Sequence, residues 1–225
     1  MIPLRRRRLR RSAAARAYSA ASPQPSSTPW REARYAVVDL ETTGLDPRGD
    51  EIVSFASVPI DAGRVVIGEA RTGIVRPEHM PEAATIRIHG LRSADLVGAP
   101  ALPEVLDVIL EALTGRVLVA HVAWVERGFL SAALKPHGLR LAKPVLDTAA
   151  LAQRVLSPNR PADPQGLPLS HAARSLGLPV HSPHVAEGDA LTTAQLFLAL
   201  ATRLDATEPQ TIGSLARLSR LQGSR

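Results

Sequence analysis

The order of strand-like and helix-like segments limits the fold of this chain more than any other feature of the sequence. Residues 35–41 (YAVVDLE) form a run rich in apolar and β-branched side chains. In residues 51–61 (EIVSFASVPID), large apolar side chains alternate with small or polar ones. A third run, residues 64–77, contains Gly68 and Gly73, where we expect a bend. Short segments rich in Asp and Gly separate the runs, as is typical of tight turns. The first half therefore predicts three antiparallel strands.

The second half alternates between helix-like and strand-like segments. Residues 103–114 place apolar side chains at helical spacing, and residues 116–121 (RVLVAH) predict a strand. The pattern continues with a helix over 122–135, a short strand and helix over 144–156, a short helix over 169–178 and a long helix over 187–204. Helices that connect strands favour parallel pairing. The sequence thus predicts a mixed α/β sheet, with three antiparallel strands, then two more, and helices packed on both faces.

The two ends differ in composition from the middle of the chain. Residues 1–31 contain eight Arg and no acid, whereas the rest has 19 basic and 21 acidic side chains. We expect this segment to be a disordered basic extension, because it carries too little apolar surface to fold. A phosphate-attracting arm and an Arg-rich organellar transit peptide are alternatives. Residues 206–225 are expected to form a basic tail, which leaves residues 32–205 as one domain.

Composition also excludes some classes of protein. The chain has no Cys, so it has no disulfides and no thiolate metal sites. No apolar run approaches the ~20 residues that a membrane span needs. We therefore expect a cytoplasmic bacterial protein without membrane contact, or an organellar protein if residues 1–31 act as a transit peptide.

Two acids lie in the first predicted strand. Asp39 and Glu41 are two residues apart, so their side chains point to the same face of the strand. Two carboxylates on one face of an apolar strand repel each other and lose hydration, which a divalent cation would offset. The alternative is that the strand reaches solvent here and that Asp39 caps the turn. A further acid, Asp147, lies where a strand passes into a helix, and we interpret it as a helix cap.

The residues around this pair resemble a known motif. The string VVDLETTGLDP (37–47) is similar to the first motif of the DEDDh exonucleases. These are 3′–5′ exonucleases like the proofreading subunit of DNA polymerase III, with a ribonuclease H-like fold. The resemblance implies that Asp39 and Glu41 are metal ligands, and that Thr42 and Leu45 contact the 3′-terminal nucleotide.

A second string, HVAEGDA (184–190), lies before the last long predicted helix. It resembles the third motif of the same family, in which a His is followed by four residues and an Asp. Imidazole titrates near neutral pH, so His184 suits the role of general base that the resemblance implies. The resemblance also implies that Asp189 binds metal.

The remaining motif departs from the family pattern. The family shows His-Asn-Ala, a variable residue, Phe-Asp and then Phe-Leu, whereas this chain has HVAWVERGFL (121–130). His121 keeps its position and is assigned to substrate binding. Val122 replaces Asn, and Glu126 replaces the metal-binding Asp. Glu126 is the only acid of this segment, so it is either the fourth metal ligand or an exposed charge on an ordinary helix.

The resemblance implies a metal-dependent exonuclease that releases nucleoside 5′-monophosphates from DNA 3′ ends. Two Mg²⁺ or Mn²⁺ ions would be the cofactors, and single-stranded DNA or frayed 3′ ends would be the substrate. A polymerase is the expected protein partner. RNA is the alternative substrate on the same fold. A nucleic-acid-binding module without catalysis is the alternative from another class, suggested by Val122 and Glu126 in the second motif.

Overall fold

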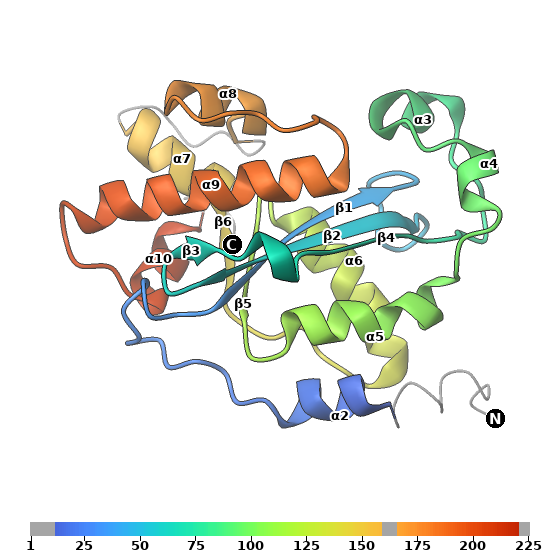
Figure 1. The fold of residues 1–225 in the computed structure, drawn as a ribbon, viewed down its shortest axis with the longest axis horizontal. Coiled ribbons are helices and arrows are strands. Elements are labelled where there is room, and N and C mark those ends of the chain that lie inside the picture. The colour runs from blue at the N-terminus through green and yellow to red at the C-terminus, as the bar shows by residue number, and fades with distance from the viewer. Residues whose placement is uncertain (1–11, 159–165, 221–225) are drawn as a thin grey trace.

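The computed structural model describes residues 12–158 and 166–220. Within these residues, six strands form one sheet with the order β3-β2-β1-β5-β6, and β4 also pairs with β2 (Figure 1). The strands are β1 (Tyr35–Thr42), β2 (Ile52–Asp61), β3 (Arg64–Val65), β4 (Arg71–Ile74), β5 (Val117–Ala120) and β6 (Val145–Asp147). The first four pair antiparallel, whereas β5 runs parallel to β1 and β6 parallel to β5. The predicted mixed α/β sheet is confirmed.

The predicted third strand, residues 64–77, is divided in the structure. A short 3-10 helix, η1 (Ile67–Glu69), separates β3 from β4, and the two strands pair with different parts of β2. The expected bend falls at η1, which contains Gly68. Gly73 has a packing role instead, because a Cβ at this position would lie 2.8 Å from the ring of Phe55.

Helices cover both faces of the sheet, as predicted (Figure 1). One face carries α7 (Thr148–Leu156), α9 (Ala186–Asp205) and α10 (Ile212–Leu218), and the other carries α2 (Ala13–Ala20), α5 (Leu102–Leu113) and α6 (Trp124–Leu134). Along β1, Tyr35 and Val37 belong to the core under α9, whereas Val38 belongs to the core under α5 and α6. Because side chains alternate along a strand, Asp39 and Glu41 lie on the α9 side.

Four shorter helices complete the described part of the chain. They are α3 (Ala83–His89), α4 (Ser93–Leu96), the 3-10 helix η2 (Lys135–His137) and α8 (Leu169–Ser175). α3 and α4 stand at the end of the molecule toward which β1 points (Figure 1). The Thr85 hydroxyl of α3 donates a hydrogen bond to the Thr43 carbonyl (3.2 Å), which ties α3 to the loop that follows β1.

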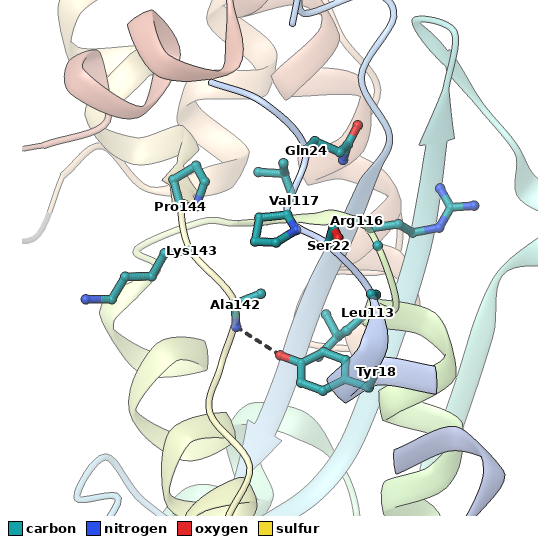
Figure 2. Close-up of a pocket in the computed structure, with 12 residues that line it drawn as sticks. Tyr18, Ser22, Gln24, Leu113, Arg116, Val117, Ala142, Lys143 and Pro144 are labelled. Carbon is teal, nitrogen blue, oxygen red and sulfur yellow. Dashed lines mark hydrogen bonds between the residues drawn. The ribbon is translucent and has the colours of Figure 1, made fainter. Parts of the chain in front are cut away.

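The N-terminal segment is ordered from residue 12 on, so the prediction of a disordered extension is wrong for residues 12–31. α2 packs against α5, and Tyr18 of α2 is buried between them and the chain before β6. Figure 2 shows its hydroxyl accepting a hydrogen bond from the Ala142 N–H (2.9 Å). The same hydroxyl donates to the Arg140 carbonyl (3.1 Å). Residues 1–11, which hold six of the eight Arg residues of the N-terminal segment, lie outside the described residues.

The segment that precedes β1 packs against α9 and the start of α10. Trp30 is 1% exposed and packs edge-on against Phe197 of α9. The Ile212 N–H donates a hydrogen bond to the Thr28 carbonyl (3.0 Å), and α10 adds buried apolar side chains to the core. The prediction of a basic tail over residues 206–225 is therefore wrong as far as residue 220, and the domain extends beyond both of its predicted limits.

No helix in the described ranges is both long and apolar enough to cross a membrane. α9 is 20 residues long, but it carries Glu187 and Asp189 in its first turn and Arg203 in its last. The predicted cytoplasmic location stays a prediction.

Candidate active site

The candidate site forms where β1 extends beyond its parallel neighbour. The last pair between β1 and β5 is Val37 with Val119, whereas β2 accompanies β1 as far as Thr42. β5 ends at Ala120, and α6 begins at Trp124 and packs against β1. α9 begins over one face of the same strand. Ligands of α/β proteins commonly bind at the carboxyl ends of parallel strands.

Three of the predicted ligands come together at this place. Asp39, Glu41 and Asp189 each offer one carboxylate oxygen, and these oxygens all lie within 4.8 Å of one another. Asp39 and Glu41 share one face of β1, and Asp189 lies in the first turn of α9, which covers that face. Three anions at this spacing repel one another unless a cation lies between them. An all-oxygen set of this kind suits Mg²⁺ or Mn²⁺.

The pKa values of these groups reflect burial and mutual repulsion. Loss of hydration raises the pKa of Asp39 well above its ordinary value, and the charges of Glu126, Glu41 and Asp189 raise it further. Loss of hydration, with a contribution from Asp189, raises the pKa of Glu41 to about 7. Burial also raises the pKa of Asp189, against the opposing effects of the His184 N–H and the His184 charge. The free cluster therefore binds protons readily, and a cation would compete with them.

Glu126 is buried at the beginning of α6. Its side chain is 4% exposed, and its Oε2 atom has no hydrogen-bond partner among the described residues. Loss of hydration raises its pKa to about 8, its own N–H lowers it, and the charges of Asp147 and Glu41 raise it. Glu126 is not part of the group within 4.8 Å, but its charge acts on Asp39. The alternative of an exposed helix charge is wrong, and metal binding by Glu126 stays a prediction.

His184 is exposed in the loop that leads into α9. Its backbone lies in the left-handed region (φ 61°), and its N–H donates a hydrogen bond to Oδ2 of Asp189 (2.9 Å). Gly188 allows this loop to pack against the helix. A Cβ there would lie 2.6 Å from the Ser182 carbonyl oxygen and closer still to that of His181. The loop is thus fixed to the first turn of α9, with His184 beside the carboxylates.

Asp147 joins the beginnings of two helices. Its Oδ1 accepts hydrogen bonds from the N–H groups of Ala149 (2.9 Å) and Val122 (3.1 Å), and its Oδ2 accepts one from Ala123 (3.1 Å). The bond from Ala149 confirms the predicted helix cap of α7. The other two bonds fix the start of α6, and therefore the backbone that carries Glu126.

The sequence profile of the exonuclease family matches residues 36–197. The chain belongs to the exonuclease family. The matched range includes every carboxylate of the site and His184, and it confirms the resemblance to the DEDDh exonucleases.

Relatives in this family include proteins named after DNA polymerase III. A DNA polymerase III subunit epsilon-like protein of Rhodobacter capsulatus is 36% identical over 201 residues, which cover 88% of this chain and 28% of the relative. The DNA polymerase III subunit epsilon of Aquifex aeolicus is 28% identical over 171 residues, which cover 76% of this chain and 81% of that protein. The chain thus spans less than a third of the first relative and most of the second.

A solved structure of the family has the same fold. Exonuclease X, in complex with 5′ overhanging duplex DNA, superposes with a TM-score of 0.63 at 24% sequence identity. The match covers 83% of this chain and 99% of that chain. The mixed sheet with helices on both faces is therefore the fold of this exonuclease family.

Thr42 and Leu45, which are predicted to touch the terminal nucleotide, differ in their exposure to solvent. Leu45 is 65% exposed in the loop after β1. Thr42 is buried, and its hydroxyl donates a hydrogen bond to the Gly44 carbonyl. The side chain of Leu45 is available to a ligand, whereas the Thr42 hydroxyl holds the loop. Contact of either residue with nucleotide stays a prediction.

The ring of His121 contacts other groups of the protein instead of facing an open site. Its Nδ1 lies 2.9 Å from the Thr148 hydroxyl, and its Nε2 lies 2.8 Å from the Leu167 carbonyl oxygen. Both ring nitrogens are therefore occupied by protein groups, and the ring ties the end of β5 to α7 and to the chain before α8. The structure does not bring His121 into the carboxylate cluster, and its assignment to substrate binding finds no support.

Two residues that shape the exonuclease site are absent from the predicted set. Gly188 could have been recognised from the sequence. A Gly inside a helix costs about 1 kcal/mol of stability relative to Ala, so its presence there indicates that close packing excludes a side chain. The second role of Asp147 has no such signal. Its other partners, Val122 and Ala123, lie just before α6 and 25 and 24 residues earlier in the chain. Only the parallel pairing of β5 with β6 brings them together.

Proposed function

We propose that this chain is a metal-dependent 3′–5′ exonuclease that releases nucleoside 5′-monophosphates from DNA 3′ ends. The observation that carries the proposal is the group formed by Asp39, Glu41 and Asp189, whose oxygens lie within 4.8 Å of one another. The names of the relatives, and the overhanging DNA bound to Exonuclease X, favour DNA over RNA as substrate. A polymerase partner belongs to the same proposal, supported by the DNA polymerase III names alone.

The carboxylate group of Asp39, Glu41 and Asp189 fits Mg²⁺ or Mn²⁺, and we propose two such ions at the site. Asp39, Glu41 and Asp189 would hold one ion, and Asp39 with Glu126 would hold the other. Bound ions of this kind supply positive charge, lower the pKa of water and stabilise a leaving oxygen. The raised pKa values of Asp39 and Glu126 support the assignment, because carboxyl groups that are costly to ionise alone gain most from a nearby cation.

His184 is the general base of the proposed reaction. A ring nitrogen of His184 takes a proton from the attacking water, the new P–O bond forms, and the bond from phosphorus to the 3′ oxygen breaks. The electron pair of the broken bond goes to the 3′ oxygen, which takes a proton from solvent water and becomes the new 3′ hydroxyl. Oδ2 of Asp189 holds the His184 loop by accepting a hydrogen bond from the His184 backbone N–H (2.9 Å). The exposed Leu45 lies in the loop after β1, where it can pack against the terminal nucleotide.

The buried state of Glu126 favours catalysis over a binding module with a decayed second motif. A buried carboxylate without partners costs several kcal/mol, and its Oε2 has none among the described residues. A chain that no longer used this group would gain stability from an apolar residue here. The Glu is therefore best explained by a ligand that the site binds.

The test is release of nucleotides from an end-labelled single strand in Mn²⁺. Asp39→Ala and His184→Ala should each reduce the rate at least ~100-fold, the lower range for loss of a catalytic acid or base. His171→Ala, at an exposed position on α8, is the matched control and should leave the rate unchanged. Undiminished hydrolysis by both site variants would refute the assignment. Parallel digestion of DNA and RNA oligomers of one sequence tests the choice of DNA.

A further inference from the structure

One aromatic side chain of this protein is exposed, and the other six are buried. The chain contains three Phe, two Trp and two Tyr. The buried residues are Tyr18, Trp30, Tyr35, Phe55, Phe129 and Phe197, whereas Trp124 is 44% exposed. A single exposed apolar residue is ordinary on a protein surface, so the position of Trp124 decides what it means.

Trp124 stands at the end of the sheet that carries the carboxylates. It is the first residue of α6, which begins shortly after β5 ends at Ala120. Glu126 follows two residues later, so the two Cα atoms are at most ~7 Å apart, given 3.8 Å between neighbouring Cα atoms. An indole ring this close to the site is within reach of a strand whose 3′ end lies at the carboxylates.

The side chain of Trp124 is directed away from the core. Residues two apart on a helix point about 200° apart, and Glu126 is the buried member of this pair. Arg127 is exposed one turn after Trp124, on the same outer side of α6. The start of α6 therefore presents an aromatic ring and a guanidinium together, beside a site proposed to cut a phosphodiester.

This pair of groups matches the chemistry of a single nucleic-acid strand. Bases without pairing partners stack on aromatic rings, and Arg binds backbone phosphates. We propose that Trp124 is a stacking platform for an unpaired base near the 3′ end of the substrate, with Arg127 attracting the adjoining phosphate. The inference rests on the proposed exonuclease function and adds a preference to it. Stacking accepts any base, but paired bases inside a duplex are already stacked, so the platform favours unpaired 3′ ends.

The first experiment measures binding without hydrolysis. Wild-type protein in EDTA is titrated with oligothymidylate, and tryptophan emission is recorded together with the anisotropy of a labelled oligonucleotide. Binding should quench the emission, since Trp30 is buried and Trp124 is the exposed one. Trp124→Ala should remove the quenching and weaken binding roughly 5- to 100-fold, the range measured for loss of one stacked base. Trp124→Phe, which keeps a ring, should retain most of the affinity.

The second experiment locates the base. Oligonucleotides that carry one abasic position, moved stepwise from the 3′ end, are compared on wild type and Trp124→Ala. The two proteins should bind equally when the abasic position falls at the platform, and differ at every other position. In Mn²⁺, Trp124→Ala should raise KM with little change in kcat, because stacking acts equally before and during the reaction. Ile67→Ala is the control, at an exposed apolar residue just after β3, near the end of β2 that pairs with the start of β1.

The outcomes separate this inference from the function on which it rests. Wild-type affinity in Trp124→Ala, with active hydrolysis, would overturn the platform and leave the ring as a surface for a protein partner. Equal quenching by a blunt duplex would overturn the preference for unpaired ends. Absence of both binding and hydrolysis in the wild-type protein would overturn the proposed exonuclease function itself.

Discussion

Replacing Glu126 by Gln removes a buried charge but keeps the volume of the side chain. The pKa of Glu126 is raised from 4.5 to about 8, mainly by loss of hydration. A carboxyl group with a raised pKa contributes its stability below the unfolded value and loses it as the pH rises through the folded value. In metal-free protein, Glu126 should therefore lower the free energy of unfolding progressively between pH 4.5 and about 8.

The expected size of this effect follows from the two pKa values. Each tenfold change in proton affinity is worth about 1.4 kcal/mol, so ionisation of Glu126 should cost on the order of 4 kcal/mol at pH 8 and less than about 1 kcal/mol at pH 5. For a domain of this size, 1 kcal/mol shifts the Tm by about 2–4 °C. In EDTA, Glu126→Gln should melt roughly 10 °C above wild type at pH 8, but only about 2 °C above it at pH 5.

The assay is thermal unfolding in EDTA and in Mn²⁺ at both pH values. A nearby cation favours the ionised carboxylate, so Mn²⁺ should stabilise wild type strongly at pH 8 and Glu126→Gln much less. Glu111→Gln, at an exposed position on α5, is the matched control and should follow wild type in both solutions. Parallel pH profiles of wild type and Glu126→Gln in EDTA would refute the buried-charge reasoning. Equal stabilisation by Mn²⁺ would refute Glu126 as a ligand, as would unimpaired hydrolysis by Glu126→Ala.

Two further substitutions test the backbone around the site. Gly188→Ala should shift the His184 loop, because the new Cβ would lie 2.6 Å from the Ser182 carbonyl oxygen, and a misplacement of about 1 Å can lower kcat roughly 100-fold. Gly68→Ala is the control, because a Cβ there would meet nothing within 4 Å. An unchanged kcat in Gly188→Ala would contradict the prediction. Val122 has a φ of 60°, in the left-handed region that is unfavourable for β-branched residues but tolerated by Asn. Val122→Asn should therefore raise the free energy of unfolding by about 1 kcal/mol in urea denaturation. Equal stability of the two proteins would show that this turn carries no strain.

The carboxylate trio could be predicted because its geometry is local or follows from simple packing. Spacing of two residues puts Asp39 and Glu41 on one face of a strand, and alternation along β1 identifies that face as the one under α9. Asp189 in the first turn of α9 then has to approach them. The strand period alone pairs Asp39 with Glu41, whereas Asp189 is assigned to the site through the resemblance of HVAEGDA to the third family motif.

The ends of the domain could not be predicted, because their order depends on contacts far along the chain. Residues 1–31 have the composition of a disordered arm, yet Trp30 is buried against Phe197. The Tyr18 hydroxyl finds its partners at Arg140 and Ala142, more than 120 residues away. The local sequence pattern does not indicate such partners, so composition alone gave the wrong domain boundary at both ends.

The replacement of the family's Asp by Glu126 also has a physical account that only the structure supplies. α6 cannot come closer to the loop after β1, because a Cβ at Gly128 would lie 2.7 Å from the Pro47 side chain, and so the helix is already in close contact. The Glu126 backbone N–H interacts with the carboxylate of the same residue and lowers its pKa. The Oε2 atom of Glu126 is buried and has no hydrogen-bond partner among the described residues. If Glu126 binds a cation as proposed, Oε2 is the oxygen available for it, and the departure in the second motif is compatible with the proposed four-carboxylate site.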